Sequence, residues 1–518
     1  MRRKKELHEV AVLVDPVRDN VAVLHRPVRR GLRLFLGDAP IVVRQSMNVG
    51  DRMTIVEIGR KRPLVQFGVP FATSHGLQAG EKITSSNTSD KLPVKGGRLA
   101  PVRPARNHRR MPASRTFSGF PRQDGSCGTR NYFVVLPTSM CASEIACHVA
   151  ETVSREGDPA GFDGVLALSH TEGCGCAGGE QIERVLRVMK NILRNPNVGG
   201  ALLVDLGCEQ TNRTAVDRHL KSVLAEGRLV KPLDWLTIQA AGGSRKAVDA
   251  GVSRLNRMLP EVRRMRRTPC PVGKLVIGVE CGASDAFSGI TANRVIGNAV
   301  DRVINTGGSA VLSEIPETIG AEALLYPRMR SRAVLEKYRE GVRWYRSMAL
   351  RMGAAMRDNL VPENRTGGLI NPSIKSIGAV MKGGSSVIQD FLQYGEKVRR
   401  RGLSIMQGPG NDLESVTGLA ATGVNLICFS TGRGTVTGCA VVPVVKISST
   451  TRLFEQLRED IDFDGGRMLG ERNQAEAIER YGGELLEKVL AVASGERSRP
   501  EITGQRQFQI WSAGKLSL

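Results

Sequence analysis

The sequence KLVIGVECGASDAFSGITAN, residues 274–293, passes abruptly from an apolar run to polar and glycine residues that fit no hydrophobic core. Residues 275–279 are typical of a buried parallel strand, because a short aliphatic and β-branched run is closed there by glycine and polar residues. In open α/β sheets ligands bind beyond the carboxyl ends of the strands, so a binding site is expected directly after this strand. The candidate side chains are Glu280, Cys281, Ser284, Asp285, Ser288, Thr291 and Asn293.

Strand and helix patterns alternate on both sides of this stretch, which predicts mostly parallel sheets with helices on both faces. Ile145, Val149 and Val153 recur at helical spacing after two candidate cap residues, Thr138 and Ser139. A second amphipathic helix is predicted over 182–193. The predicted strands cover residues 132–136, 165–168, 201–206, 310–312, 403–406 and 425–429.

The pattern divides the chain into four parts. Residues 1–95 contain short β-type runs with turn residues between them, which predicts a small all-β module. Residues 96–115 are rich in Pro and Arg and are interpreted as an extended linker. Residues 116–268 and 269–518 are predicted to form a second, α/β domain and a C-terminal α/β domain that carries the chemistry. The basic stretch 254–267 is expected at a domain boundary or on an exposed helix, and 322–359 and 484–493 are expected to be helical.

Length and composition restrict the class of protein. A chain of 518 residues is too long for one core. No segment has the apolar length of a membrane span, and the first residues do not resemble a secretory signal, so the cytoplasm is the expected location. Ten cysteines in so long a chain are not a disulfide framework, which favours reduced thiols with ligand or catalytic roles.

The net charge of +23 raises the possibility of a nucleic-acid partner. Nucleic-acid binders usually combine such charge with interleaved aromatic residues or a known module, and aromatic residues make up only 4% of this chain. A basic surface that helps to attract an anionic substrate is the favoured interpretation, and nucleic-acid binding is disfavoured.

Four cysteines follow predicted strands: Cys141, Cys174, Cys208 and Cys281. If the strands are parallel, all four thiols lie on one sheet edge, where soft thiolates could bind iron or zinc. Buried cysteines are more often small apolar residues, and no CxxC pair is present, so a metal site and simple packing both stay open. His170, in Ser169-His-Thr-Glu-Gly-Cys174-Gly-Cys176, could bind the metal or transfer a proton, or could be a packing residue.

Several cationic residues lie in glycine-rich turns. Arg433 stands between two glycines and is a candidate forked donor to a carboxylate, or else part of a surface turn. Lys375, Lys382 and Lys446 are further candidates, either for substrate binding and proton transfer or as ordinary solvated lysines.

Five motifs resemble the altronate and galactarate dehydratase family and occur in that family's order between residues 10 and 466. They are Phe117-x-Gly119-Phe-x-Arg122-x-Asp124-Gly125-x-x-Gly128-Thr-Arg-Asn131, Gly207-Cys-Glu209, Glu280-Cys-Gly282-x-Ser284-Asp285-x-x-Ser288-Gly-Ile-Thr-Ala-Asn293, Gly367-Gly-Leu369 and Thr431-Gly-Arg-Gly434. The resemblance implies an N-terminal β-clip module of the SAF type and a two-part catalytic region. It also implies ferrous-iron-assisted dehydration of a sugar acid to a 2-keto-3-deoxy acid, or sulfite elimination as in a related branch.

The chain departs from the family pattern at several positions. Gly50-Asp51-Arg52 stands where the family usually has Gly-His-Lys, and Thr84-Ser85-Ser86-Asn87 stands where it has His-x-His-Asn. Ile374 replaces a glutamate, and Thr450 replaces an asparagine. Each change removes a possible ligand or proton-transfer group.

These patterns predict a cytoplasmic hydro-lyase that acts on a small anionic sugar acid such as altronate or galactarate, with Fe²⁺ or another divalent metal. The alternative is a non-catalytic or re-specialised homologue, such as a sulfo-lyase or an acidic-ligand binder. A homodimer is the working expectation, and no membrane partner is expected. The predicted catalytic residues are Glu280, Asp285 and Lys375; the substrate-binding residues are Arg130, Ser284, Asn293, Arg433 and Lys446; and the metal neighbourhood is Cys141, His170, Cys174, Cys208 and Cys281.

Overall fold

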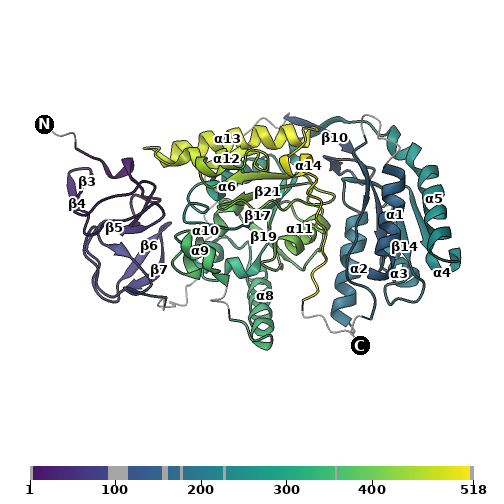
Figure 1. Cartoon of the computed structure of the whole chain (residues 1–518), viewed down its shortest axis with the longest axis horizontal. Helices are drawn as coiled ribbons and strands as arrows, with labels where there is room; N and C mark the ends of the chain where they lie inside the picture. Colours follow the sequence, from purple (N-terminus) through teal and green to yellow (C-terminus); the bar gives the residue numbers. More distant parts are fainter. Residues whose placement is uncertain are drawn as a thin grey trace.

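The structure is a computed structural model that describes residues 4–90, 115–154, 162–175, 179–225, 229–355 and 359–513. Its elements form three groups, and the C-terminal α/β domain lies between the N-terminal module and the second domain (Figure 1). The predicted α/β class with mostly parallel sheets is confirmed for the two larger groups. The predicted linker lies outside the described residues, except for Arg115.

The N-terminal module consists of short antiparallel strands after one 3-10 turn, η1 (Leu7–Glu9). Its largest sheet has the order β1-β2-β5-β8, and two smaller sheets, β3-β4 and β6-β7-β9, lie beside it. The strands are β1 (Ala11–Val12), β2 (Val21–Leu24), β3 (Arg33–Leu36), β4 (Ala39–Val42), β5 (Arg52–Thr54), β6 (Pro63–Gln66), β7 (Val69–Ser74), β8 (Lys82–Ile83) and β9 (Thr88–Ser89).

The second domain is a parallel sheet of order β13-β12-β14-β15. Its strands are β12 (Tyr132–Pro137), β13 (Gly164–Ala167), β14 (Val198–Asp205) and β15 (Leu233–Thr237), and only β15 was not predicted. Apolar residues of α1 (Ser143–Ser154) and α5 (Ser244–Arg264) share one core with the sheet, and those of α2 (Gly179–Leu193) and α3 (Arg213–Ala225) belong to another. The basic stretch 254–267 therefore forms mainly the last part of a long helix.

The C-terminal domain has a seven-stranded parallel sheet of order β19-β20-β18-β17-β21-β22-β23. Residues 276–282 form its central strand, β17 (Val276–Gly282). This strand is buried because a strand on each side and helices on both faces of the sheet cover it. The other strands are β18 (Ser309–Leu312), β19 (Ile388–Leu392), β20 (Gly402–Met406), β21 (Leu426–Thr431), β22 (Val444–Ser448) and β23 (Phe463–Asp464). Its main helices are α6 (Ala292–Asn305), α8 (Arg332–Arg351), α10 (Pro372–Val380), α11 (Asp412–Ala421), α12 (Thr451–Gln456) and α13 (Gln474–Ala493).

A small antiparallel sheet joins the two α/β domains. In it β10 (Thr116–Pro121) pairs with β11 (Cys127–Gly128) on one side and with β16 (Thr268–Pro271) on the other. The start of the second domain is thus fixed to the start of the C-terminal domain, although about 150 residues separate them in the chain.

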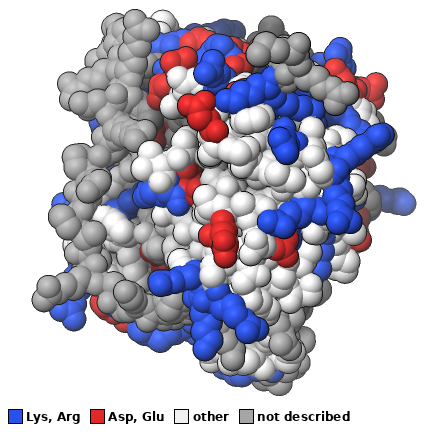
Figure 2. Space-filling model, turned by 90° about the vertical axis from the view of Figure 1, so that its left-hand side faces the viewer, with Lys and Arg blue, Asp and Glu red and all other residues white. Residues whose placement is uncertain are grey.

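Basic residues are spread over the molecular surface. On the face presented by the N-terminal module, Lys and Arg side chains alternate with uncharged and acidic ones and do not form one continuous stripe (Figure 2). Among the described residues, no helix is both long and apolar enough to cross a bilayer.

Candidate active site

The candidate site begins where β17 and β18 end. Two non-glycine residues have a positive φ angle there, Ala283 at 51° and Glu314 at 66°. Such left-handed backbone is costly for residues with a Cβ and is concentrated at functional sites, where the surroundings hold it in place. Glu314 is itself one of the buried acidic residues of the candidate site.

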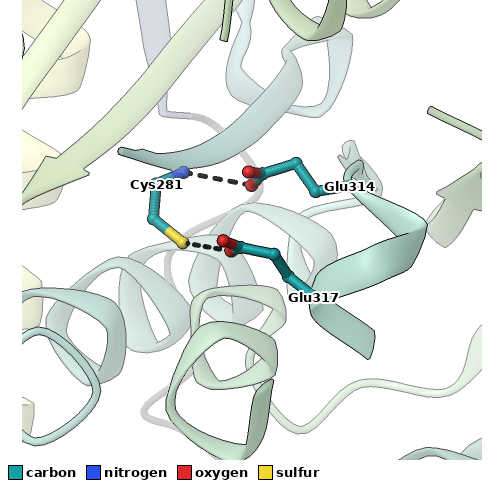
Figure 3. A group of neighbouring side chains, drawn as sticks. All are labelled: Cys281, Glu314 and Glu317. Atoms are coloured by element: carbon teal, nitrogen blue, oxygen red, sulfur yellow. Dashed lines mark hydrogen bonds between the residues drawn. The ribbon is translucent and has the colours of Figure 1, made fainter. Parts of the chain in front are cut away.

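We use the name acid–lysine cluster for Glu280, Cys281, Glu314, Glu317 and Lys382. All five side chains are buried. Lys382 Nζ donates to Glu314 Oε2 at 2.7 Å and to Cys281 Sγ at 2.8 Å. The Cys281 thiol donates to Glu317 Oε2 at 3.0 Å, and its backbone N–H donates to Glu314 Oε2 at 3.2 Å (Figure 3). One ammonium therefore holds a thiol and two carboxylates, and together with Lys382 itself the cluster comes from three chain segments.

Burial and mutual charge shift the pKa of each member of the cluster. Desolvation, together with repulsion from Glu314, raises the pKa of Glu280 well above its usual range, which favours the neutral carboxyl. The pKa of Glu314 is raised to about 7 by burial and by Glu317, while Lys382 opposes the shift. Attraction from Cys281 and the glutamates overcomes desolvation and raises the pKa of Lys382, which therefore stays charged.

The cluster resembles a metal-ligand set, because ligand atoms of Cys281, Glu314 and Glu317 lie within 4.8 Å of one another. However, the Lys382 ammonium already contacts the Cys281 sulfur and the Glu314 carboxylate that an ion would need. An internal cation of this kind performs the charge balance that a metal would otherwise supply. These residues therefore do not fit a metal ion unless Lys382 moves away.

A second carboxylate group adjoins the cluster and includes Asp412, whose ligand atom lies within 4.8 Å of those of Glu280 and Glu314. Ser415, on the same helix as Asp412, donates its hydroxyl to Glu280 Oε2 at 2.6 Å. Lys446 is fully buried near these acids, 3.3 Å from the centre of the Phe429 ring, and no described residue accepts a hydrogen bond from its Nζ. Desolvation lowers the pKa of Lys446 to about 7. The amine and ammonium forms of Lys446 are thus nearly equally favoured at neutral pH.

Lys375 connects the acid–lysine cluster to a small pocket, because it contacts Glu317 of the cluster and lines the pocket. Glu317 Oε1 lies 3.0 Å from Lys375 Nζ, and Lys375 also donates to the Asn359 carbonyl at 2.8 Å. Lys375 lines the pocket together with Ser284, Asp285, Asn293, Ile374 and Arg52. The pocket admits little more than a water molecule, so a sugar acid could enter only if its walls moved apart.

Asp285 is fixed tightly in the pocket wall. Its Oδ1 accepts from the hydroxyl and backbone N–H of Ser288, both at 2.8 Å, and its Oδ2 accepts from the Ser449 hydroxyl at 2.9 Å. Burial still raises its pKa. Gly432 has to lack a side chain here, because a Cβ would lie 2.6 Å from the Asp285 backbone nitrogen.

The N-terminal module contributes Arg52 to this pocket. The Arg52 side chain is buried, donates to Gln66 within its own module and to the Gly368 carbonyl of the C-terminal domain, and lies close enough to Asp285 to interact with its charge. Desolvation lowers its pKa to about 10, so it remains a cation. Arg52 is one of the positions at which the chain departs from the family pattern.

The remaining departures have simple structural consequences. Asp51 forms an ion pair with Lys82 at 2.8 Å, and the hydroxyls of Thr84 and Ser86 bond to each other at 2.8 Å. Ile374 is buried and lines the pocket without a charge. Thr450 caps α12 by accepting from the Leu453 N–H, so it still serves the backbone there.

Some predicted substrate-binding residues are engaged elsewhere. Arg130 donates all of its guanidinium hydrogens to Glu501 and to the carbonyls of Thr129, Val492 and Glu496, which ties the second domain to the end of the chain. Asn293 bonds Gly378 O and Ser430 Oγ, so it braces the pocket wall. Arg433 is exposed and makes only long contacts at 3.3 and 3.4 Å.

The structure does not bring the five predicted metal ligands together. Cys281 lies near the end of β17 in the seven-stranded sheet, whereas Cys141, Cys174 and Cys208 follow β12, β13 and β14 in the four-stranded sheet. The expectation of one shared edge for four thiols is therefore wrong, because the strands belong to two sheets. His170 is buried, with Nε2 2.8 Å from the Pro137 carbonyl and Nδ1 accepting from the Glu172 N–H, so both ring nitrogens have partners.

Sequence reasoning missed Glu314, Glu317 and Asp412. A signal was present for the two glutamates, because Glu314 and Glu317 come two and five residues after the predicted strand 310–312. Asp412 comes from the first turn of α11, after Asn411, which caps that helix. Only the packing of α11 against β17 brings Asp412 to Glu280.

Comparisons with known proteins agree with this architecture. Residues 272–516 match the family described as D-galactarate/Altronate dehydratase, C-terminal, and residues 119–263 match D-galactarate dehydratase/Altronate hydrolase, second domain. The chain is 32% identical to an altronate dehydratase of Bacillus subtilis over 96% of its own length and 97% of the relative's. It is 34% identical to galactarate dehydratase (L-threo-forming) of Escherichia coli, covering 74% and 73% of the two chains.

A more distant relative is the (2R)-sulfolactate sulfo-lyase subunit beta of Chromohalobacter salexigens, at 29% identity over 76% of this chain and 97% of the relative. Among solved structures, a carbon monoxide dehydrogenase of Carboxydothermus hydrogenoformans aligns over 71% of this chain and 60% of its own at 11% identity, and a TM-score of 0.17 establishes no common fold. Because the family matches cover most of the chain and full-length relatives exceed 30% identity, the chain belongs to the D-galactarate/altronate dehydratase family.

Proposed function

We propose that this protein is a carbon–oxygen lyase that dehydrates a sugar acid of the altronate or galactarate type to a 2-keto-3-deoxy acid. The observation that carries the proposal is a continuous line of polar contacts from the buried cluster to the pocket, which runs from Glu314 to Lys382, Cys281, Glu317 and Lys375. The names of the family relatives support the reaction class.

Elimination of water next to a carboxylate needs a base for the α-proton and positive charge for the developing enolate. We assign the base to the carboxylate of Asp285, which lines the pocket. Lys375 is the matching cation, because Glu317 raises its pKa and holds it as an ammonium. Arg52 and Ser284 would hold the substrate carboxylate and hydroxyls, and Glu280 would act as a buried proton reserve at the far end of the line.

Iron or another divalent metal is part of the proposal. Such an ion would act as a Lewis acid toward the substrate oxygens. Lys382 fills the cysteine–glutamate group of the acid–lysine cluster, and His170 has both nitrogens engaged. Of the five predicted ligands, the thiols of Cys141, Cys174 and Cys208 are therefore the ones that stay available for a soft metal.

The first experiment is an assay of the anaerobically purified, iron-supplied protein with a panel of aldonates and aldarates. We expect 2-keto acid formation from at least one member, and solvent deuterium at C3 of the product. Asp285→Asn and Lys375→Met should each lower kcat by about 100-fold or more, as loss of acid–base groups usually does. Lys337→Met is the matched control, because Lys337 pairs with Asp390 at the exposed surface.

Turnover of none of these acids would overturn the dehydratase proposal. Release of sulfite from sulfolactate instead would identify the protein as a re-specialised homologue. This alternative is favoured by the Asp51–Lys82 and Thr84–Ser86 pairs, because they stand where the family pattern has imidazoles. We also propose a cytoplasmic location and a homodimer, for which fractionation of the native host and light scattering of the purified chain are the direct measurements.

A further inference from the structure

Three loops of the second domain meet at the carboxyl edge of its parallel sheet. They follow β12, β13 and β14, which are neighbours in the sheet. The Met140 N–H donates to the Glu172 carbonyl, which joins the first loop to the second. Thr211 donates its hydroxyl to Thr138 O at 2.6 Å and to Gly173 O at 3.2 Å, which joins the third loop to both.

Glu209 strengthens this junction from within. Its Oε1 accepts from the hydroxyls of Thr138 and Ser139, at 2.8 and 3.2 Å, and its Oε2 accepts from the Gly207 N–H at 2.7 Å. Thr138 and Ser139, expected from the sequence to cap a helix, instead bind this buried glutamate. Gly173 permits the close approach, because a Cβ would lie 2.4 Å from the Thr138 carbonyl.

Each of the three loops carries one cysteine at this edge of the sheet. We use the name thiol edge for Cys141, Cys174 and Cys208. Burial raises the pKa of the Cys141 thiol, and the neighbouring thiols of Cys174 and Cys208 raise this pKa further. Cys141 and Cys208 are exposed and Cys174 is half-buried, so all three sulfurs are accessible from solvent. Buried cysteines that merely pack have none of these properties.

The spacing of the sulfurs indicates which kind of centre fits. Among the described residues, the groups of metal-ligand atoms that all lie within 4.8 Å of one another are in the C-terminal domain, and the three thiols do not form such a group. A single tetrahedral ion with metal–sulfur bonds of about 2.3 Å holds its sulfur ligands roughly 4 Å apart. Wider spacing fits a polynuclear centre, in which each thiolate binds a different iron.

We propose that Cys141, Cys174 and Cys208 hold an iron–sulfur cluster on the second domain, separate from the acid–lysine cluster. The cluster assembles from ferrous and ferric iron together with sulfide, so no electron has to be added or removed, and the three thiols lose their protons as they bind iron. The inference goes beyond the proposed function, because it assigns iron to a place outside the pocket in which Arg52, Asp285 and Lys375 would hold the substrate. Its test measures metal and sulfide, so it can stand or fall independently of turnover.

The thiol edge also lies on the side of the second domain that faces the candidate active site. Glu172, beside Gly173, is close enough to Glu414 on α11 to raise the pKa of that carboxyl. Two other residues at the start of the same helix, Asp412 and Ser415, face the acid–lysine cluster. The beginning of α11 therefore separates the two centres, and a cluster at the thiol edge would lie next to this boundary.

The experiment is anaerobic reconstitution of the full chain with ferrous iron, ferric iron and sulfide, followed by desalting and by measurement of iron, acid-labile sulfide and visible absorption. We expect iron and sulfide to bind in equal amounts. Cys141→Ser, Cys174→Ser and Cys208→Ser should each lower both by about tenfold or more, since each removes one ligand. Circular dichroism of the unloaded variants checks that the fold is unchanged.

Two variants serve as matched controls. Cys147→Ser changes a half-buried thiol on α1 of the same domain, and Cys281→Ser changes the thiol that Lys382 contacts. Both should keep iron and sulfide at the parent level. Iron without sulfide, loss of iron in Cys281→Ser but not in the thiol-edge variants, or a Cys141–Cys174 disulfide in the anaerobic protein would each overturn the proposal. A loaded cluster in a protein that dehydrates no sugar acid would support the site and refute the proposed function.

Discussion

At the scale of single residues, Lys382 is the most consequential side chain of the candidate site. A fully buried ammonium is tolerated only where acceptors replace its hydration, and here Glu314 and Cys281 do so at 2.7 and 2.8 Å. The same contacts determine which carboxyls carry a proton, because Lys382 opposes the rise in the pKa of Glu314 and helps to lower that of Glu317. Stability and proton distribution therefore depend on one residue.

Lys382→Met should destabilise the chain strongly. Removal of one partner from a buried ion pair leaves the other charge without compensation, which costs about 3–5 kcal/mol. Urea unfolding of the purified variant measures the change. Lys337→Met breaks the exposed pair with Asp390 and should cost less than about 1 kcal/mol. Equal losses in the two variants would contradict the assigned role of Lys382.

At the scale of elements, α11 is the helix that links the two centres. Asn411 caps it by accepting from the Leu413 N–H, which fixes the direction of its first turn. From that turn Asp412 and Ser415 face Glu280, while Glu414 lies near Glu172 of the second domain. A rotation of this helix by one residue would disrupt both arrangements, because successive side chains point about 100° apart.

Glu414→Gln should change the pH dependence of stability. Burial and repulsion from Glu172 raise the pKa of Glu414 from 4.5 to about 7 in the folded chain. The pKa of Glu414 is higher in the folded chain than in the unfolded chain. The stability that the neutral carboxyl contributes is therefore fully present below pH 4.5 and is lost as the pH rises through about 7. The neutral glutamine should therefore raise Tm at pH 8 and leave it unchanged near pH 4.5. A rise of the same size at both pH values would rule out titration of Glu414 as the cause.

At the scale of the whole molecule, the pocket is complete only when the N-terminal module docks on the C-terminal domain. Arg52 bonds the Gly368 carbonyl across the interface, and Asn371 at the start of α10 donates to Phe71 O and Asp90 of the module at 3.1 and 2.9 Å. Figure 1 shows the module beside α9 (Pro362–Thr366) and α10, far from the second domain. Residues of the module and of the C-terminal domain therefore line one nearly closed pocket together.

Arg52→Met should weaken this docking. We expect faster backbone hydrogen exchange in residues 283–289 and 366–370, and a higher KM for the substrate, because the variant loses both the interdomain hydrogen bond and a pocket cation. Arg44→Met is a suitable control, since Arg44 is exposed and its bonds stay within the module. Unchanged exchange in both variants would show that Arg52 does not hold the domains together.

Much of the fold could be predicted because its local patterns agree with its tertiary structure. The strands that become β12, β14, β17, β20 and β21 are short apolar runs bounded by glycine and polar residues, and each was placed within a few residues. β15, β19, β22 and β23 were not predicted, because their sequences mix apolar with charged or polar residues. Burial in a parallel sheet overrode those weaker local signals.

The sequence by itself determined the class of fold, the family motifs and the rule that reactive side chains follow the strands, because strand periodicity and glycine placement are local properties. Only the tertiary structure decided which of those side chains meet. It assigned Cys281 and three other cysteines to different sheets, placed Lys382 where a metal was conceivable, and brought Arg52 to Asp285. Sheet order, helix packing and domain docking depend on contacts between residues hundreds of positions apart, which no local pattern contains.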